Sequence, residues 1–168
     1  MPQHDDKADR VWTLMKEIGV AMVVTHDARA DRLRARPMAA RPDAVNNAIY
    51  FLTDAAAPKL GEIDRNHNIC LAFSDINGQN YVSLTGRGEI SNDRDKIKQF
   101  WAATDKAFWP NADDPAIRLL RVAPEEAEYW EGAGLIVSSV RMIAAAIAGA
   151  RSDLGDNEKV RLSRPAGA

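Results

Sequence analysis

The residues best suited to chemistry follow a strand in the first third of the chain. Residues 49–53 form a β-branched and aromatic run between polar turn residues, which predicts a strand. A short alanine loop leads to Pro58, which is typical of a first helical turn because its missing N–H is not needed there. Lys59 would then project from the start of a helix, where free backbone N–H groups and its ammonium favour a phosphate. A solvated surface lysine is the alternative interpretation.

A second candidate is the strand predicted over residues 33–40. Pro37 removes one N–H from the strand ladder, which is typical of an edge or interrupted strand. Such a strand leaves backbone groups free to meet a ligand, and Arg36 lies directly before the proline. Arg29, Arg32 and Arg34 lie nearby, and a solvated strand edge is the alternative interpretation of this arginine run.

Several other chemistries are disfavoured. The three histidines are scattered, and none accompanies a serine or cysteine in a nucleophile-type turn. No His, Asp or Glu cluster has metal-ligand spacing, and the glycine fingerprints of Walker and Rossmann sites are missing. Cys70, the only cysteine, lies in an apolar run, where an inert buried thiol is favoured over a nucleophile.

Composition sets the broad class of the protein. The 168 residues suit a single domain over residues 1–168, and 46% hydrophobic with 27% charged residues is an ordinary globular balance. A net charge of −2 gives no electrostatic reason to expect nucleic acid or a membrane surface as a partner. The polar N-terminus and the absence of a long apolar run lead us to expect a cytoplasmic protein.

The elements that would position these residues are strands in succession with helices between some of them. This order favours an α+β fold, mainly β, with an antiparallel barrel and peripheral helices. Residues 20–25 predict a strand buried on both faces, Gly86 and Gly88 indicate a bulge, and Pro124 is expected to break a strand. Further strands are expected over residues 69–73, 80–90, 117–122 and 125–131, with a turn at 75–78, and helices over 6–18, 58–66, 93–101 and 138–150. Residues 105–115 are expected to form a loop, and the polar stretch after residue 151 to wrap over the surface or a neighbour.

Several segments together resemble the pyridoxamine 5′-phosphate oxidase-like family, in particular its general stress protein branch. The segments are Arg36-Pro37-Met38, Tyr50-Phe51-Leu52-Thr53-Asp54, Pro58-Lys59, Tyr81-Val82-Ser83-Leu84-Thr85-Gly86-Arg87-Gly88-Glu89, Phe108-Trp109-Pro110 and Ala127-Glu128-Tyr129-Trp130. The resemblance implies a six-stranded antiparallel split β-barrel of Greek-key type. It also implies a homodimer with two flavins at the interface.

The resemblance further implies which residues bind the flavin. Arg36 would reach the phosphate or ring edge of FMN, Lys59 would bind the phosphate, and Trp109 would cover the ring from the partner subunit. The other implied contacts to the ring or ribityl chain are Pro37, Met38, Phe51, Leu52, Thr53, Tyr81 and Ser83. Core packing is the alternative role for Phe51 and Leu52, a strand surface for Tyr81, and a plain interface for Trp109.

One departure from the family pattern affects the expected cofactor. Related phosphate sites often carry Ser-Arg-Lys where this chain has Ala57-Pro58-Lys59, so FMN could bind weakly and FAD is possible. We expect flavin-dependent oxidoreduction of an unknown small molecule, without a histidine as acid or base. The alternatives are a flavin-binding or stress-response protein without turnover, and a split barrel that binds haem or a deazaflavin.

Overall fold

The strands form one antiparallel sheet whose outermost strands are neighbours in the sequence. The structure is a computed structural model that describes residues 6–132 and 156–162. Its helices are α1 (Asp6–Ile18), α2 (Lys59–Arg65) and α3 (Arg94–Phe100), and a 3₁₀ turn spans Ala103–Ala107. Its strands are β1 (Val20–Asp27), β2 (Arg32–Ala39), β3 (Arg41–Asp43), β4 (Ala48–Asp54), β5 (Asn68–Asp75), β6 (Asn80–Ser91), β7 (Ile117–Glu131) and β8 (Asp156–Arg161).

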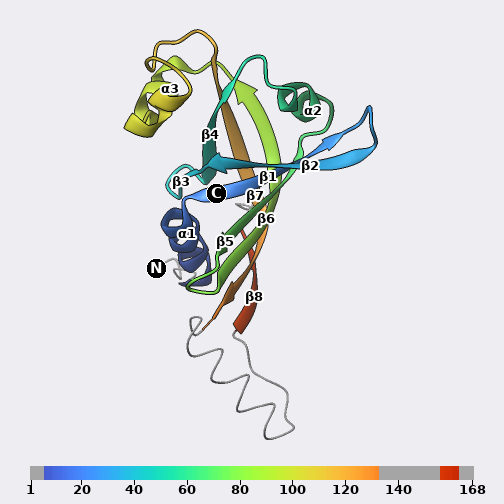
Figure 1. The fold of residues 1–168 in the computed structure, drawn as a ribbon. Coiled ribbons are helices and arrows are strands. Elements are labelled where there is room, and N and C mark those ends of the chain that lie inside the picture. The colour runs from blue at the N-terminus through green and yellow to red at the C-terminus, as the bar shows by residue number, and fades with distance from the viewer. Residues whose placement is uncertain (1–5, 133–155, 163–168) are drawn as a thin grey trace, which may run out of the picture.

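The strand order explains why the sheet curls into a barrel. The order is β2-β1-β5-β6-β7-β4-β3, and β8 pairs with β7. Only Ala40 lies between β2 at one edge and β3 at the other, so the chain itself brings the two edges together. The Ala40 N–H donates to the Gly19 carbonyl at 2.8 Å, which ties this crossing to the start of β1. Figure 1 shows the resulting open barrel, with β2 and β3 meeting beside β4.

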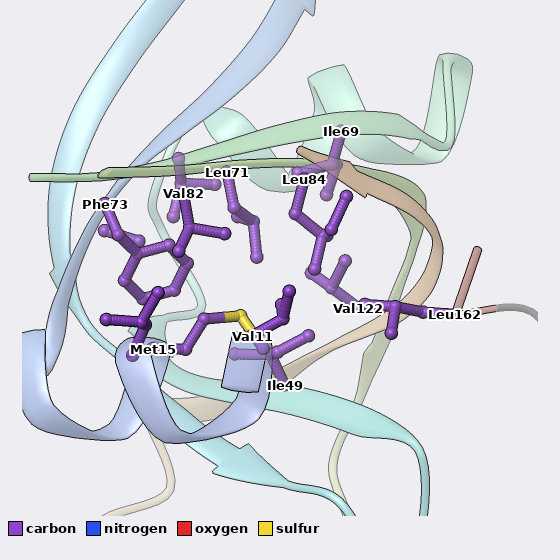
Figure 2. Packing of buried hydrophobic residues seen from close by; sticks show 14 of the residues in the cluster. Val11, Met15, Ile49, Ile69, Leu71, Phe73, Val82, Leu84, Val122 and Leu162 are labelled. Carbon is purple, nitrogen blue, oxygen red and sulfur yellow. The ribbon is translucent and has the colours of Figure 1, made fainter. Parts of the chain in front are cut away.

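The interior of the barrel is one hydrophobic core that α1 helps to fill. Val11, Leu14 and Met15 of α1 are buried, and α1 packs against β3, β5, β6 and β8. Figure 2 shows Val11 and Met15 facing strand residues that include Phe73 and Val82. The helix therefore fills the interior through one face, as the spacing of its apolar residues predicted.

A second core lies on the other face of β4. Ala48, Tyr50 and Leu52 pack there with Ile97 of α3, Trp109 and residues of β7, and the Tyr50 and Phe100 rings stack at 4.5 Å. The alternate residues Ile49 and Phe51 enter the barrel core instead. β4 is therefore buried on both faces, which is the arrangement of a strand between two packed layers.

Several sequence expectations are confirmed. The α3 helix is capped by the Asp93 side chain, which accepts a hydrogen bond from the Lys96 N–H. The Asp75 side chain accepts from the backbone of Asn77 and Gly78 in the turn between β5 and β6. The expected bulge lies at Gly86, where a Cβ atom would come within 2.4 Å of the Ala123 carbonyl.

Other expectations are wrong. β1 is buried on one face only, because its residues alternate between the core and an open surface on which Val20 is 50% exposed. Pro124 does not break β7, since Gly86 lies opposite the proline and the register shift leaves Glu125 out of the pairing. The loop expected over 105–115 begins with the turn Ala103–Ala107, which the sequence did not indicate.

The C-terminal part was predicted incompletely. The polar stretch at 156–161 is a strand paired with β7, and the pairing brings Val160 into the barrel core. The helix predicted over 138–150 lies outside the described residues. Among the helices that the structure describes, none is long and apolar enough to cross a membrane.

Candidate functional site

The structure brings most of the predicted site residues together around one cavity of about 270 Å³. The cavity lies between the end of β2, the end of β4, the start of α2 and the segment 105–109. It is lined by Pro37, Met38, Leu52, Thr53, Lys59 and Trp109, together with Ala39, Arg41, Asp54, Ala57, Asp105 and Phe108. We call it the β4–α2 cavity.

Lys59 supplies the cation of the β4–α2 cavity. It is the first residue of α2, directly after Pro58, as the sequence predicted. Its side chain is partly buried and makes no hydrogen bond or ion pair with any residue in the described part of the chain. Burial lowers the pKa of Lys59, and the charge of Arg36 lowers it further, while Glu62 and Asp54 raise it. An unpaired ammonium at a cavity wall is suited to an anionic ligand.

Thr53 contributes a second polar group without a partner. The residue is 3% exposed, and among the described residues its hydroxyl is the buried side-chain oxygen or nitrogen that lacks a hydrogen bond. A buried hydroxyl without a partner costs roughly 1–3 kcal/mol, so native proteins seldom leave one unless something binds it. Thr53 and Lys59 therefore both indicate that the β4–α2 cavity is suited to binding a ligand.

Arg36 has partners within the chain. Its guanidinium donates to the Thr25 hydroxyl at 2.8 Å and to the Glu62 carboxylate at 2.9 Å. Thr25 in turn donates to the other Glu62 oxygen at 2.5 Å. Burial raises the pKa of Glu62, but the hydrogen bonds from Arg36 and Thr25 and the charge of Arg36 outweigh burial and lower it. This network joins α2 to β1 and β2, and the contact of Arg36 with a cofactor stays a prediction.

Trp109 is held within its own chain. It is 9% exposed, packs in the second core, and its indole N–H donates to Asp54 at 3.3 Å. The hydrogen bonds from the Ala56 N–H and from Trp109 lower the pKa of Asp54. Asp54 thus caps the turn after β4 and also fixes the indole at the cavity wall. Contact of Trp109 with the flavin of a partner subunit stays a prediction.

Sequence reasoning missed the ion pair that positions this wall. Arg41 of β3 donates to both Asp105 carboxylate oxygens at 2.7 Å and to the Phe100 carbonyl at 2.9 Å. Asp105 also accepts from the Ala102 N–H at 2.8 Å. The pair is largely buried and ties the turn before Trp109 to the sheet edge. Nothing in the local pattern could indicate it, because the partners are far apart in the sequence.

Arg36 and three further predicted residues do not line the β4–α2 cavity. Phe51 is fully buried in the barrel core, in keeping with the alternative role weighed for it. Tyr81 and Ser83 lie on β6, opposite Ser74 and Ala72 of β5, and Tyr81 is 36% exposed. Contacts of these three residues with a cofactor stay predictions.

Comparison with known proteins agrees with this fold. The family described as "Pyridoxamine 5'-phosphate oxidase like" matches residues 6–153. The protein bli-3 of Neurospora crassa is 22% identical over 153 residues, which are 85% of this chain and 73% of that protein.

Solved structures with the same fold include two general stress proteins. General stress protein 26 from Jannaschia sp. CCS1 superposes with a TM-score of 0.74 and 21% identity over 93% of this chain and 98% of its own. The general stress FMN/FAD binding protein from Xanthomonas citri gives a TM-score of 0.63 and 21% identity over 73% of this chain and 87% of its own. These neighbours have the split-barrel fold predicted above, with a mainly antiparallel sheet. Because the family match spans most of its length, the chain belongs to the pyridoxamine 5′-phosphate oxidase-like family.

Proposed function

We propose that this protein binds a flavin, FMN in the first place, in the β4–α2 cavity. The carrying observation is that this cavity contains both an unpaired lysine ammonium, Lys59, and a buried hydroxyl without a partner, Thr53. The name of the Xanthomonas citri neighbour, an FMN/FAD binding protein, agrees with a flavin. The names of the structural neighbours support binding of a flavin, and we infer that this flavin is FMN.

The residues of the cavity fit the parts of FMN. Lys59 would pair with the phosphate dianion, because an ammonium and a phosphate form strong charge-assisted hydrogen bonds. Thr53 would hydrogen-bond the ribityl chain or the ring edge, and Met38, Leu52 and Trp109 offer apolar surface for a flat ring. A bound flavin accepts and donates hydride or single electrons, whereas the protein binds it, orients it and excludes water.

We further propose that a second copy of the chain completes the site. The cavity of about 270 Å³ is just below the roughly 300–1,000 Å³ of typical ligand pockets, so one chain would enclose only part of a flavin. Phe108, at its rim, is 76% exposed, which is unusual for so large an apolar side chain. The open face of the sheet also carries Val20, Met22 and Tyr81, and these residues would be buried in a dimer.

The cofactor is tested by preparing the protein without ligand and titrating it with FMN by calorimetry. We expect saturable binding in a 1:1 ratio per chain, and weaker binding for Lys59→Met and Thr53→Val, each with a thermal stability no lower than that of wild type. Failure of FMN to bind the folded wild-type protein would refute the proposal. Titration with haem and with a deazaflavin in the same experiment separates the two other ligands.

Sedimentation tests the dimer. We expect a dimer at micromolar concentration that dissociates more readily in Phe108→Ser. A monomer that still holds FMN with full affinity would refute the shared site.

We propose an oxidoreductase activity on an unknown small molecule. The rival is a flavin-binding or stress-response protein without turnover. Mixing the FMN-loaded protein with a reduced nicotinamide cofactor in the absence of oxygen separates the two, because an oxidoreductase would bleach the flavin absorption at a rate that saturates with the reductant. A cytoplasmic location stays a prediction from the sequence.

A further inference from the structure

A second cavity is lined in part by the loop that leads into α2. It has a volume of about 540 Å³ and is formed by the β1–β2 hairpin and α2, which pack against each other. Figure 1 shows the end of this hairpin extending beside α2. The lining residues are Asp27, Arg29, Arg34, Ala55, Ala57, Pro58, Leu60, Gly61, Glu62 and Arg65. We call it the hairpin cavity.

The charged side chains that line the hairpin cavity have a net positive charge. Its two carboxylates already have cationic partners, since Asp27 pairs with Arg34 at 3.0 Å and Glu62 pairs with Arg36 at 2.9 Å. Arg29 and Arg65 have no carboxylate within ion-pair distance in the described part of the chain. The Arg65 side chain makes one long contact, 3.5 Å, to the Gly61 carbonyl. Two guanidinium groups are therefore free to bind an anion.

The two walls present these cations from different elements. Arg29 comes from the turn of the hairpin, where the Asp27 carboxylate accepts from the Arg29 and Ala30 N–H groups and fixes the backbone. Arg65 comes from the last turn of α2. Both guanidinium groups therefore line the cavity that a ligand would enter, and their planar shape is suited to phosphate oxygens.

The hairpin cavity adjoins the proposed flavin site through shared and neighbouring lining residues. Ala57 lines both cavities, and Pro58 of the hairpin cavity directly precedes Lys59 of the β4–α2 cavity. A ligand whose first phosphate reaches Lys59 would therefore have its next phosphate close to the loop formed by Ala55, Ala57 and Pro58. FMN, a mononucleotide, ends at this first phosphate, whereas FAD, a dinucleotide, carries a second phosphate and an adenosine beyond it.

We propose that the hairpin cavity is a second anion subsite that binds the phosphate groups of a dinucleotide, with the adenylate half of FAD as its occupant. This inference rests on the proposed flavin function and extends it. It assigns Arg29 and Arg65 a role in selecting FAD over FMN, while Lys59 serves both flavins.

The test compares FMN and FAD affinities of arginine variants. We expect Arg29→Gln and Arg65→Gln each to weaken FAD binding by roughly three- to fivefold, and the double variant by about tenfold or more, since both positions are exposed to solvent. FMN binding should not change. The FAD affinity should also fall more steeply with salt than the FMN affinity, because more charges are paired.

Arg32→Gln is the matched control. Arg32 lies on the same hairpin, opposite Asp27, and lines neither cavity, so its loss removes the same charge without the contact. We expect it to leave both affinities unchanged. Equal losses for FMN and FAD in the Arg29 and Arg65 variants, or losses in the Arg32 variant as large as theirs, would overturn the subsite.

Two further arms separate the possible failures. ADP, which carries the pyrophosphate and adenosine without a flavin, should bind wild type and lose affinity in the double variant. If FMN binds but neither FAD nor ADP does, the subsite is wrong and the flavin function stands; if no flavin and no ADP binds, both are wrong. If the FMN-loaded protein binds NADPH in an Arg29- and Arg65-dependent way while FAD binding ignores these residues, the assignment to FAD is overturned.

Discussion

Replacing Lys59 by methionine tests the phosphate contact most directly. The change keeps a long side chain and removes the ammonium, which has no partner in the described part of the chain. A charge-assisted hydrogen bond contributes roughly 1.5–3 kcal/mol, and 1.4 kcal/mol corresponds to tenfold in affinity. We therefore expect FMN to bind about 10- to 150-fold more weakly. Calorimetric titration of the ligand-free protein measures this loss.

The same variant makes a separate prediction for the protein without ligand. Because burial and Arg36 lower the pKa of Lys59, the folded state binds fewer protons than the unfolded state as the pH approaches 10.5. Lys59 therefore destabilises the fold at neutral pH, and this cost fades as the pH rises through its lowered pKa. Lys59→Met should be at least as stable as wild type at pH 7, and the difference should shrink towards pH 10 in urea unfolding.

Lys106→Met is the control for a general charge effect. Lys106 is exposed on the turn next to the β4–α2 cavity and does not line it. The control should retain full FMN affinity. Equal FMN affinities of wild type and Lys59→Met would show that Lys59 does not bind the phosphate. An equal loss of affinity in Lys106→Met would show that Lys59 acts only through long-range electrostatic attraction.

Three other regions yield predictions. Glu62→Gln should lower the free energy of unfolding by roughly 2–4 kcal/mol at pH 7, since it leaves Arg36 without a charged partner. Because the pKa of Glu62 is lowered, wild type should lose this advantage as the pH falls below about 4.5. Equal acid unfolding of both proteins would contradict the reasoning. Arg36→Met should weaken FMN binding, and the double variant with Glu62→Gln should regain affinity if Arg36 acts by occupying Glu62; no recovery would favour direct contact. FMN should quench tryptophan fluorescence, with most of the quenching lost in Trp109→Phe; unchanged quenching would place the ring away from this wall. The rate of any turnover should show no step between pH 6 and 8 that disappears in His26→Asn or His67→Asn, because neither histidine lines the β4–α2 cavity.

Much of the fold could be predicted because the local patterns were strong. Alternating apolar residues marked β6 and the 3.6-residue period marked α1, since each pattern reflects one buried face. Pro58 indicated the start of α2 because its backbone chemistry acts locally. The break predicted at Pro124 was wrong because it considered the local sequence alone. The proline is tolerated inside β7 because Gly86, on the neighbouring strand, permits a bulge opposite it.

The electrostatic part of the site could not be predicted. Arg36 and Glu62 are 26 positions apart, and Arg41 and Asp105 are 64 apart. Their meeting depends on the order of strands in the sheet, which periodicity does not determine. The pairing of residues 156–161 with β7 has the same origin, because a largely polar strand has no strong pattern of its own.

The availability of Lys59 follows from where its neighbouring carboxylates are used. Glu62 is three residues further along α2, the usual spacing for a helical ion pair, yet both of its oxygens are engaged by Arg36 and Thr25. Asp54 is engaged by the Ala56 N–H and the Trp109 indole. The network of Arg36 thus does more than join α2 to the barrel, because it engages both oxygens of Glu62, which then makes no ion pair with Lys59. A lysine without an ion-pair partner, beside an arginine, lowers the stability of the fold, and the proposed binding of a phosphate dianion would offset this cost.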